Sequence, residues 1–135
     1  MSLVLLYVTT FAVFLGLDYF GLTLLIKPTF ERDIGGLLSD SPRYGPALAF
    51  YAFYILGVLW FVSLPALSGD RSLLWVFGTG ALLGAMAYGT YEFTNLATLT
   101  GWTWRMLATD LIWGTILTGT AATLGVLATR ALTPT

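Results

Sequence analysis

Three carboxylic acids, Asp18, Glu92 and Asp110, interrupt apolar stretches of this sequence and are its clearest candidates for chemistry. An ionised carboxylate at the centre of a bilayer costs about 2.5 to 3.5 kcal/mol on insertion scales, so such residues are usually paired, hydrated or functional. By helical rise, Asp18 lies about 13 Å inside Lys27, while Glu92 and Asp110 lie about 12 and 8 Å inside the loop that joins their two helices. These depths are measured from one membrane face, which predicts one carboxylate layer with at least two acids in direct or one-water contact.

One helix adds further polar side chains to this layer. Tyr88, Glu92 and Asn95 share a helical face at positions i, i+4 and i+7, and Tyr91 flanks that face. Glu92 also continues a row of glycines, so it is expected to be the most buried of the acids. The predicted ligand-binding set contains the acids and their polar neighbours: Asp18, Tyr88, Tyr91, Glu92, Asn95 and Asp110.

Two interpretations of this set remain open. In the first, the carboxylates bind a ligand or exchange protons, and Arg105 is the nearest candidate counter-ion. In the second, each carboxyl is neutral and hydrogen-bonds to a tyrosine, an asparagine or Trp113, holding helices together without a ligand. The residue types alone fit both interpretations.

The absence of two residue types excludes much familiar chemistry. The chain has no cysteine and no histidine, so thiol nucleophiles, disulfides, Cys/His zinc sites and imidazole haem ligands are excluded. The only lysine, Lys27, ends the first apolar stretch, which argues against a buried Schiff base. No metal site or catalytic residue is predicted and the cofactor is left unknown, although an enzyme built from these side chains would use oxygen-ligated Mg²⁺ or Mn²⁺.

The elements that position the acids follow from composition. Of 135 residues, 57% are hydrophobic and 10% are charged, and the net charge of -1 without a basic run argues against a nucleic-acid partner. We expect an all-α integral membrane protein with a single four-helix domain, since a span needs about 20 apolar residues. The predicted spans are Leu3 to Ile26, Pro46 to Leu67, Leu73 to Leu99 and Met106 to Thr129.

The connections predict how these helices are arranged. Short second and third loops favour an antiparallel bundle. The longer first loop, Lys27 to Gly45, places Phe30, Ile34 and Leu37 at helical spacing, which predicts a short interfacial helix. Four basic residues on the side of the first and third loops, against two on the other side, predict that both termini lie outside the cytoplasm.

Small residues recur at every fourth position in two of the spans. In the third span, Gly80 and Gly84 lie on one row with Tyr88 and Glu92. In the fourth span, Asp110 and Gly114 lie on one row in the same way. Such rows let two helix backbones approach closely in lipid, so we expect these helices to pack together, with a homodimer as the other use of the rows. The glycines around Gly80 have the wrong spacing for a dinucleotide site, and no strand precedes them.

A resemblance to a known family is carried by two blocks, Tyr88–Leu99 (YGTYEFTNLATL) and Asp110–Thr115 (DLIWGT), with Trp102 between them. They resemble the signature of a bacterial family of small predicted membrane proteins catalogued as domain of unknown function two-one-seven-seven. The family commonly has Asp where this chain has Glu92. The resemblance implies a four-helix protein of a bacterial inner membrane, with polar positions including Asp18, Glu92 and Asp110 and also Asn95. It implies no activity.

Three functions are compatible with these observations. The first is an intramembrane carboxylate pocket that binds a lipid headgroup or another amphiphile. The second is a proton- or cation-coupled transporter acting as a homodimer, because buried acids serve as proton relays. The third is an accessory structural subunit of a larger membrane complex, in which the acids hold helices together. Whether the protein is an enzyme stays open.

Overall fold

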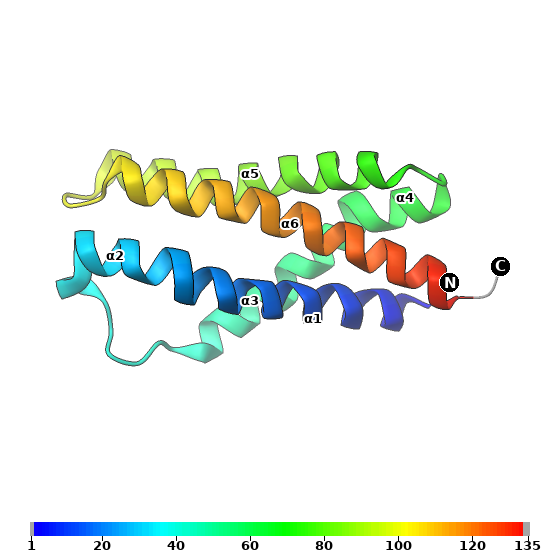
Figure 1. Ribbon diagram of the computed structural model, residues 1–135, viewed down its shortest axis with the longest axis horizontal. Coiled ribbons are helices and arrows are strands. Elements are labelled where there is room, and N and C mark those ends of the chain that lie inside the picture. The colour runs from blue at the N-terminus through cyan, green and yellow to red at the C-terminus, as the bar shows by residue number, and fades with distance from the viewer. Residues whose placement is uncertain (1, 134–135) are drawn as a thin grey trace.

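The fold consists of helices joined by short connections. The computed structural model describes residues 2–133, and that part of the chain contains no strand. Its helices form four segments long and apolar enough to cross a membrane: Leu3–Leu37, Tyr44–Ser68, Leu73–Thr98 and Trp104–Leu132. Successive segments run in opposite directions along the long axis of the molecule (Figure 1). The predicted all-α membrane fold with four spans is confirmed, and most helix ends lie within three residues of the predicted positions.

The first segment is longer than predicted. It comprises α1 (Leu3–Gly21), the π-helical turn η1 (Leu22–Ile26), α2 (Lys27–Ile34) and the 3₁₀ turn η2 (Gly35–Leu37). The helix predicted in the first loop is therefore α2, and it continues α1 rather than standing apart. Its apolar face is covered by protein, because Phe30 is buried with Met106 and meets the Trp102 ring edge-on at 5.4 Å.

The second segment also contains a π-helical turn between two α-helices. It comprises α3 (Tyr44–Val58), the π-helical turn η3 (Leu59–Ser63) and α4 (Leu64–Ser68). In η1 the Lys27 N–H bonds to the carbonyl of Leu22, and in η3 the Leu64 N–H bonds to that of Leu59, each five residues back. A proline follows directly in both cases. Proline has no N–H and crowds the preceding turn, and a widened turn accommodates it without ending the helix.

The last two segments, α5 (Leu73–Thr98) and α6 (Trp104–Leu132), pack closely along their small-residue rows. A Cβ atom added to Gly84 would lie 2.6 Å from the Gly114 carbonyl oxygen, and one added to Gly114 would lie 2.1 Å from the Tyr88 ring. Neither position has room for a side chain. The expected contact between these helices is confirmed, and the same contact fixes Tyr88 against α6.

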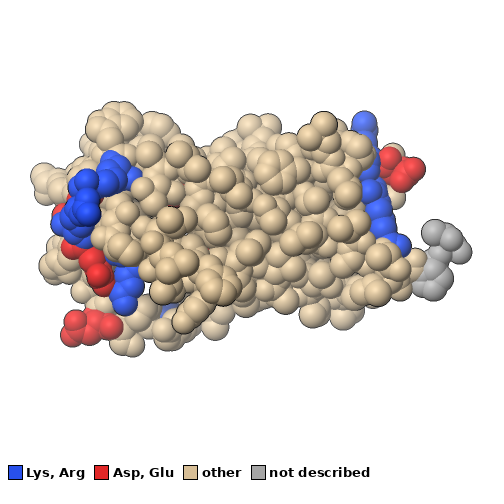
Figure 2. Space-filling model, in the orientation of Figure 1, with Lys and Arg blue, Asp and Glu red and all other residues tan. Residues whose placement is uncertain are grey.

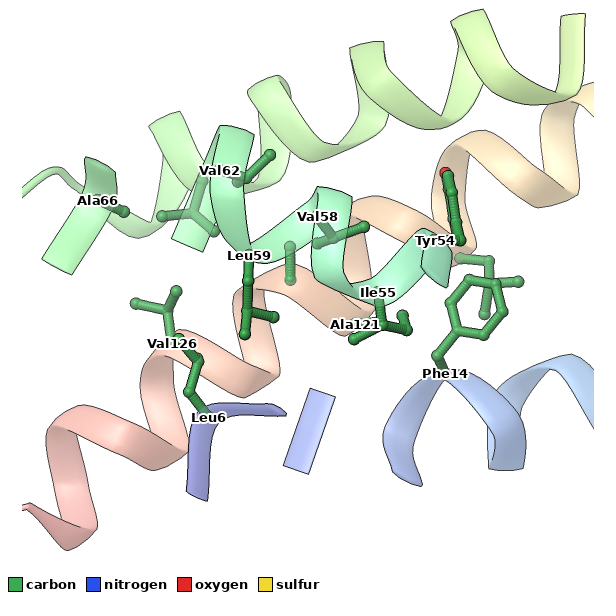
Figure 3. Close-up of a cluster of buried hydrophobic side chains, with 13 residues drawn as sticks. Leu6, Phe14, Tyr54, Ile55, Val58, Leu59, Val62, Ala66, Ala121 and Val126 are labelled. Carbon is green, nitrogen blue, oxygen red and sulfur yellow. The ribbon is translucent and has the colours of Figure 1, made fainter. Parts of the chain in front are cut away.

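The four segments do not lie parallel. α1, α5 and α6 run side by side, while α3 crosses obliquely toward α4, which lies beside the start of α5 (Figure 1). Buried side chains from α1, α3, η3 and α6, among them Phe14, Ile55 and Val126, fill the core at this crossing (Figure 3). Toward the end of the molecule that carries the first loop, α3 diverges from α5, and every residue from Tyr44 to Phe50 is exposed. This divergence leaves one end of the bundle open.

Charged side chains gather at the two ends of the molecule (Figure 2). At the end with the first and third loops, Arg105 lies 2.7 Å from Asp33, and Thr103 also donates to that carboxylate. At the other end, the Arg130 guanidinium donates to the carbonyls of Ala66 and Arg71. Both contacts join segments that are distant in sequence, and they mark the limits of the apolar belt between them.

Candidate functional site

A pocket of about 520 Å³ lies where α3 diverges from the other helices. All four segments contribute to its wall. The first segment supplies Asp18, Leu22, Ile26 and Phe30, one residue per helical turn. The other segments supply the remaining lining residues: Phe50, Tyr51 and Tyr54 from α3, Ala87, Tyr88 and Tyr91 from α5, and Asp110 from α6.

Asp18 lies at the inner end of the stripe on the first segment and is only 4% exposed. The Tyr51 side chain and the Trp113 indole both approach its carboxyl group. The buried Trp113 N–H nevertheless has no acceptor at hydrogen-bond geometry. Gly21 makes room for this indole, since a Cβ atom there would lie 2.1 Å from the ring. The glycine and the tryptophan thus form one wall of the Asp18 site.

Glu92 lies behind the pocket and does not line it. Its side chain is fully enclosed, and its Oε1 accepts a 2.9 Å hydrogen bond from the Trp102 indole N–H. Its Oε2 has no donor. The Asp110 carboxyl lies within hydrogen-bonding reach of Glu92. As expected, Glu92 is the most buried of the three acids.

The remaining members of the predicted set divide into two groups. Tyr88 and Tyr91 line the pocket. Asn95 does not line it; its side chain contacts Tyr91 instead. The structure therefore places Asp18, Asp110 and the two tyrosines on the pocket wall, with Glu92 and Asn95 behind them.

Aromatic rings that the sequence did not single out complete the wall. Phe50 stacks on Tyr54 with ring centroids 5.9 Å apart, and Tyr54 meets Tyr88 edge-on at 6.5 Å. The Tyr54 hydroxyl is held by a 2.8 Å hydrogen bond with Thr118. Counting helical rise from the start of α3 would have placed Tyr51 about 10 Å deep, close to the depth of Asp18. The similar depths of Tyr51 and Asp18 could therefore have indicated from the sequence that Tyr51 lies near the acids.

The expected counter-ion is not at the pocket. Arg105 pairs with Asp33 outside the carboxylate layer. No lysine or arginine appears among the residues that line this pocket within the part of the chain the structure describes. The pocket therefore combines carboxylates with aromatic rings and lacks a fixed positive charge.

The acids are not arranged as a metal centre. Among residues 2–133, no three Asp, Glu, His or Cys side chains lie close enough together to coordinate one ion. The carboxyl groups of Glu92 and Asp110 lie within hydrogen-bonding reach of each other, while Asp18 faces Tyr51 and Trp113. Such an arrangement can accept hydrogen bonds, attract a cation into the pocket or hold a proton between two carboxyl groups.

Comparison with known proteins gives a family but no activity. A family model described as "Predicted membrane protein (DUF2177)" matches residues 3–127. No protein with a curated description matches the chain. No solved structure matches it.

Proposed function

We propose that this chain, which belongs to the DUF2177 family of predicted membrane proteins, binds one amphiphile in the pocket between its four segments. The observation that carries the proposal is the make-up of the pocket wall. Asp18 and Asp110 provide carboxyl groups, and Leu22, Ile26 and Phe50 provide apolar surface in the same cavity. Ligand sites commonly combine a mostly apolar wall with a few polar groups that orient the ligand, in volumes of about 300 to 1,000 Å³.

The oblique course of α3 supports entry from the bilayer. Its first residues, Tyr44 to Phe50, are all exposed, and Phe50 also lines the pocket. An amphiphile that placed its head group beside Asp18 would extend its chain past Phe50 toward the lipid. The head group would then exchange its solvent for carboxylates and tyrosines, while its tail stayed among apolar groups.

The proposal is tested by counting amphiphiles that stay bound to the protein. The full chain is purified in maltoside micelles and examined by native mass spectrometry, with the bound molecules extracted and quantified. We expect one retained amphiphile. Ala87→Phe, which fills the pocket, and Asp18→Asn, which removes a charge from its wall, will each reduce retention.

Two matched variants control for non-specific effects. Ala97→Phe adds the same ring to an exposed position of α5, and Asp40→Asn removes an exposed carboxylate near the first loop. Both will retain the amphiphile at the level of the unmodified chain. Equal retention in the Ala87→Phe protein would contradict the proposal. A polypeptide that copurifies stoichiometrically, with the pocket empty, would favour the accessory-subunit function.

Proton-coupled transport by a homodimer is a second candidate because Glu92 and Asp110 are in contact. Two carboxyl groups this close hold one proton between them at little cost, and such pairs serve as relays in membrane pumps. Vesicles that contain the protein and a pH-sensitive dye would report proton flux under an imposed cation gradient. Glu92→Gln will abolish the proton flux if this function operates. Unchanged flux would show that Glu92 only holds helices together.

A further inference from the structure

We infer that the head group selected by this pocket is an ammonium cation, because acidic and aromatic side chains line one cavity that has no basic residue in its described wall. The inference rests on the proposed amphiphile site and names its ligand class. It follows from two independent features of the wall, its charge and its ring faces.

The first feature is the charge. Asp18 and Asp110 line the pocket, and Glu92, fully enclosed with an unpartnered Oε2, lies directly behind Asp110. The nearest basic residue in sequence, Lys27, points into solvent, where its side chain is 69% exposed and lies 3.8 Å from Glu31. A phosphate or sulfate head group would therefore find no basic partner among the lining residues. An ammonium group would offset the charge of the carboxylates in a site of low dielectric.

The second feature is the set of ring faces. Six aromatic residues from three segments line the pocket together with the two aspartates: Phe30, Phe50, Tyr51, Tyr54, Tyr88 and Tyr91. The face of an aromatic ring attracts a cation within about 6 Å, and cages of such rings recognise methylated ammonium groups. The hydrogen bond between the Tyr54 and Thr118 hydroxyls and the packing of Tyr88 on Gly114 hold two of these rings in place. These two rings therefore need little rearrangement to meet a ligand.

Together these features distinguish an ammonium group from a neutral donor. A hydroxyl head group could donate to Asp18, but it would gain nothing from the ring faces and would leave the carboxylate charge uncompensated. A trimethylammonium group uses both the rings and the charge. The site should therefore prefer the cation even when it offers no N–H donor.

The test compares ligands that share a tail and differ in head group. Native mass spectrometry of the full chain in maltoside micelles measures retention of palmitoyl-oleoyl phosphatidylcholine against phosphatidylglycerol with the same acyl chains. A second pair compares dodecyltrimethylammonium with dodecanol. We expect the ammonium member of each pair to bind about tenfold more tightly, and free tetramethylammonium chloride to compete with it.

A ring substitution tests the cage separately from the charge. Phe50→Leu keeps an apolar side chain but removes a ring from the pocket wall, and it will weaken binding of dodecyltrimethylammonium about fivefold. Phe53→Leu is the matched control, since Phe53 is exposed one turn further along α3 and does not line this pocket. If both substitutions weaken binding of dodecyltrimethylammonium equally, the aromatic rings of the pocket do not form a binding cage for the ammonium group.

The outcomes separate this inference from the proposed function. If phosphatidylglycerol binds as well as phosphatidylcholine and Ala87→Phe still abolishes retention, the amphiphile site stands and the ammonium preference is wrong. If neither an amphiphile nor tetramethylammonium binds, both fail. If tetramethylammonium binds and no amphiphile does, the amphiphile site is wrong and the ligand is a small ammonium cation.

Discussion

The indole N–H of Trp102 donates a 2.9 Å hydrogen bond to Oε1 of Glu92, so the loop after α5 folds back onto a carboxyl group that is fully enclosed. Trp102→Phe removes this donor and leaves Oε1 of Glu92 without its hydrogen bond. We expect the free energy of unfolding to fall by about 1 to 3 kcal/mol, the cost of an unsatisfied buried polar group. Equilibrium unfolding in mixed micelles, followed by circular dichroism, measures this change. Trp104→Phe, at a 69% exposed position, is the control and will have a much smaller effect.

The second prediction concerns the contact between α5 and α6. Gly114→Ala places a methyl group 2.1 Å from the present position of the Tyr88 ring, so the helices must separate or the tyrosine must move. Overpacking of this kind costs about 1 to 3 kcal/mol, and it will also weaken amphiphile binding because Tyr88 lines the pocket. The same substitution at Gly16, where nothing lies within 4 Å, will leave both properties unchanged or raise stability slightly. Similar losses from both variants would contradict the close helix contact.

A third prediction addresses the charged contact between the first and third loops. The Asp33 side chain is 5% exposed and pairs with Arg105, whose side chain is 52% exposed. Asp33→Asn and Arg105→Gln will each lower the melting temperature, and the double variant will lower it no further than the worse single one. Added salt will reduce the effect of Arg105→Gln, since an exposed partner is screened. Fully additive losses would show that the two side chains do not interact in the membrane.

The fourth prediction is the orientation of the chain. The end with the first and third loops carries Lys27, Arg32, Arg43 and Arg105, while the opposite end carries Arg71 and Arg130. Basic loops are retained in the cytoplasm, so this end, with the pocket, is expected there and both termini outside. Because the sequence has no cysteine, single substitutions Ser39→Cys and Ser68→Cys can be labelled in intact cells without background. We expect an impermeant reagent to label Ser68→Cys and not Ser39→Cys. Labelling of Ser39→Cys alone would show that the chain has the opposite orientation.

The sequence predicted the number and type of the helices because hydropathy and span length are local properties. Counting residues along each helix also predicted that the acids lie at similar depths, but not that Glu92 pairs with Asp110 while Asp18 faces Tyr51 and Trp113. The two π-helical turns were missed. Pro28 and Pro65 signal a disturbed turn, but whether the helix stops, bends or widens depends on the packing around it. The same limit explains why α2 continues α1 in the structure instead of forming a separate interfacial helix.

The site was predicted in part. Asp18 and Asp110 stood out because charge is rare in lipid, and Tyr88 because it shares a helical face with Glu92. Tyr51 and Tyr54 did not stand out, because an aromatic residue in an apolar span is ordinary and only the oblique course of α3 brings these rings to the acids. Arg105 was expected near the pocket from its position in sequence. Its actual partner, Asp33, belongs to the helix predicted in the first loop, and periodicity alone did not reveal that this helix continues α1.

A structure of the full chain determined in lipid, without added detergent, tests the amphiphile pocket most directly. We predict one elongated density with its head between Asp18 and Asp110 and its tail passing Phe50 into the bilayer. We also predict that this density is lost in the Ala87→Phe protein and kept in the Ala97→Phe protein. A pocket closed by α3 packing against α5, or one that holds only separate waters in the unmodified chain, would show that the protein has no amphiphile site there.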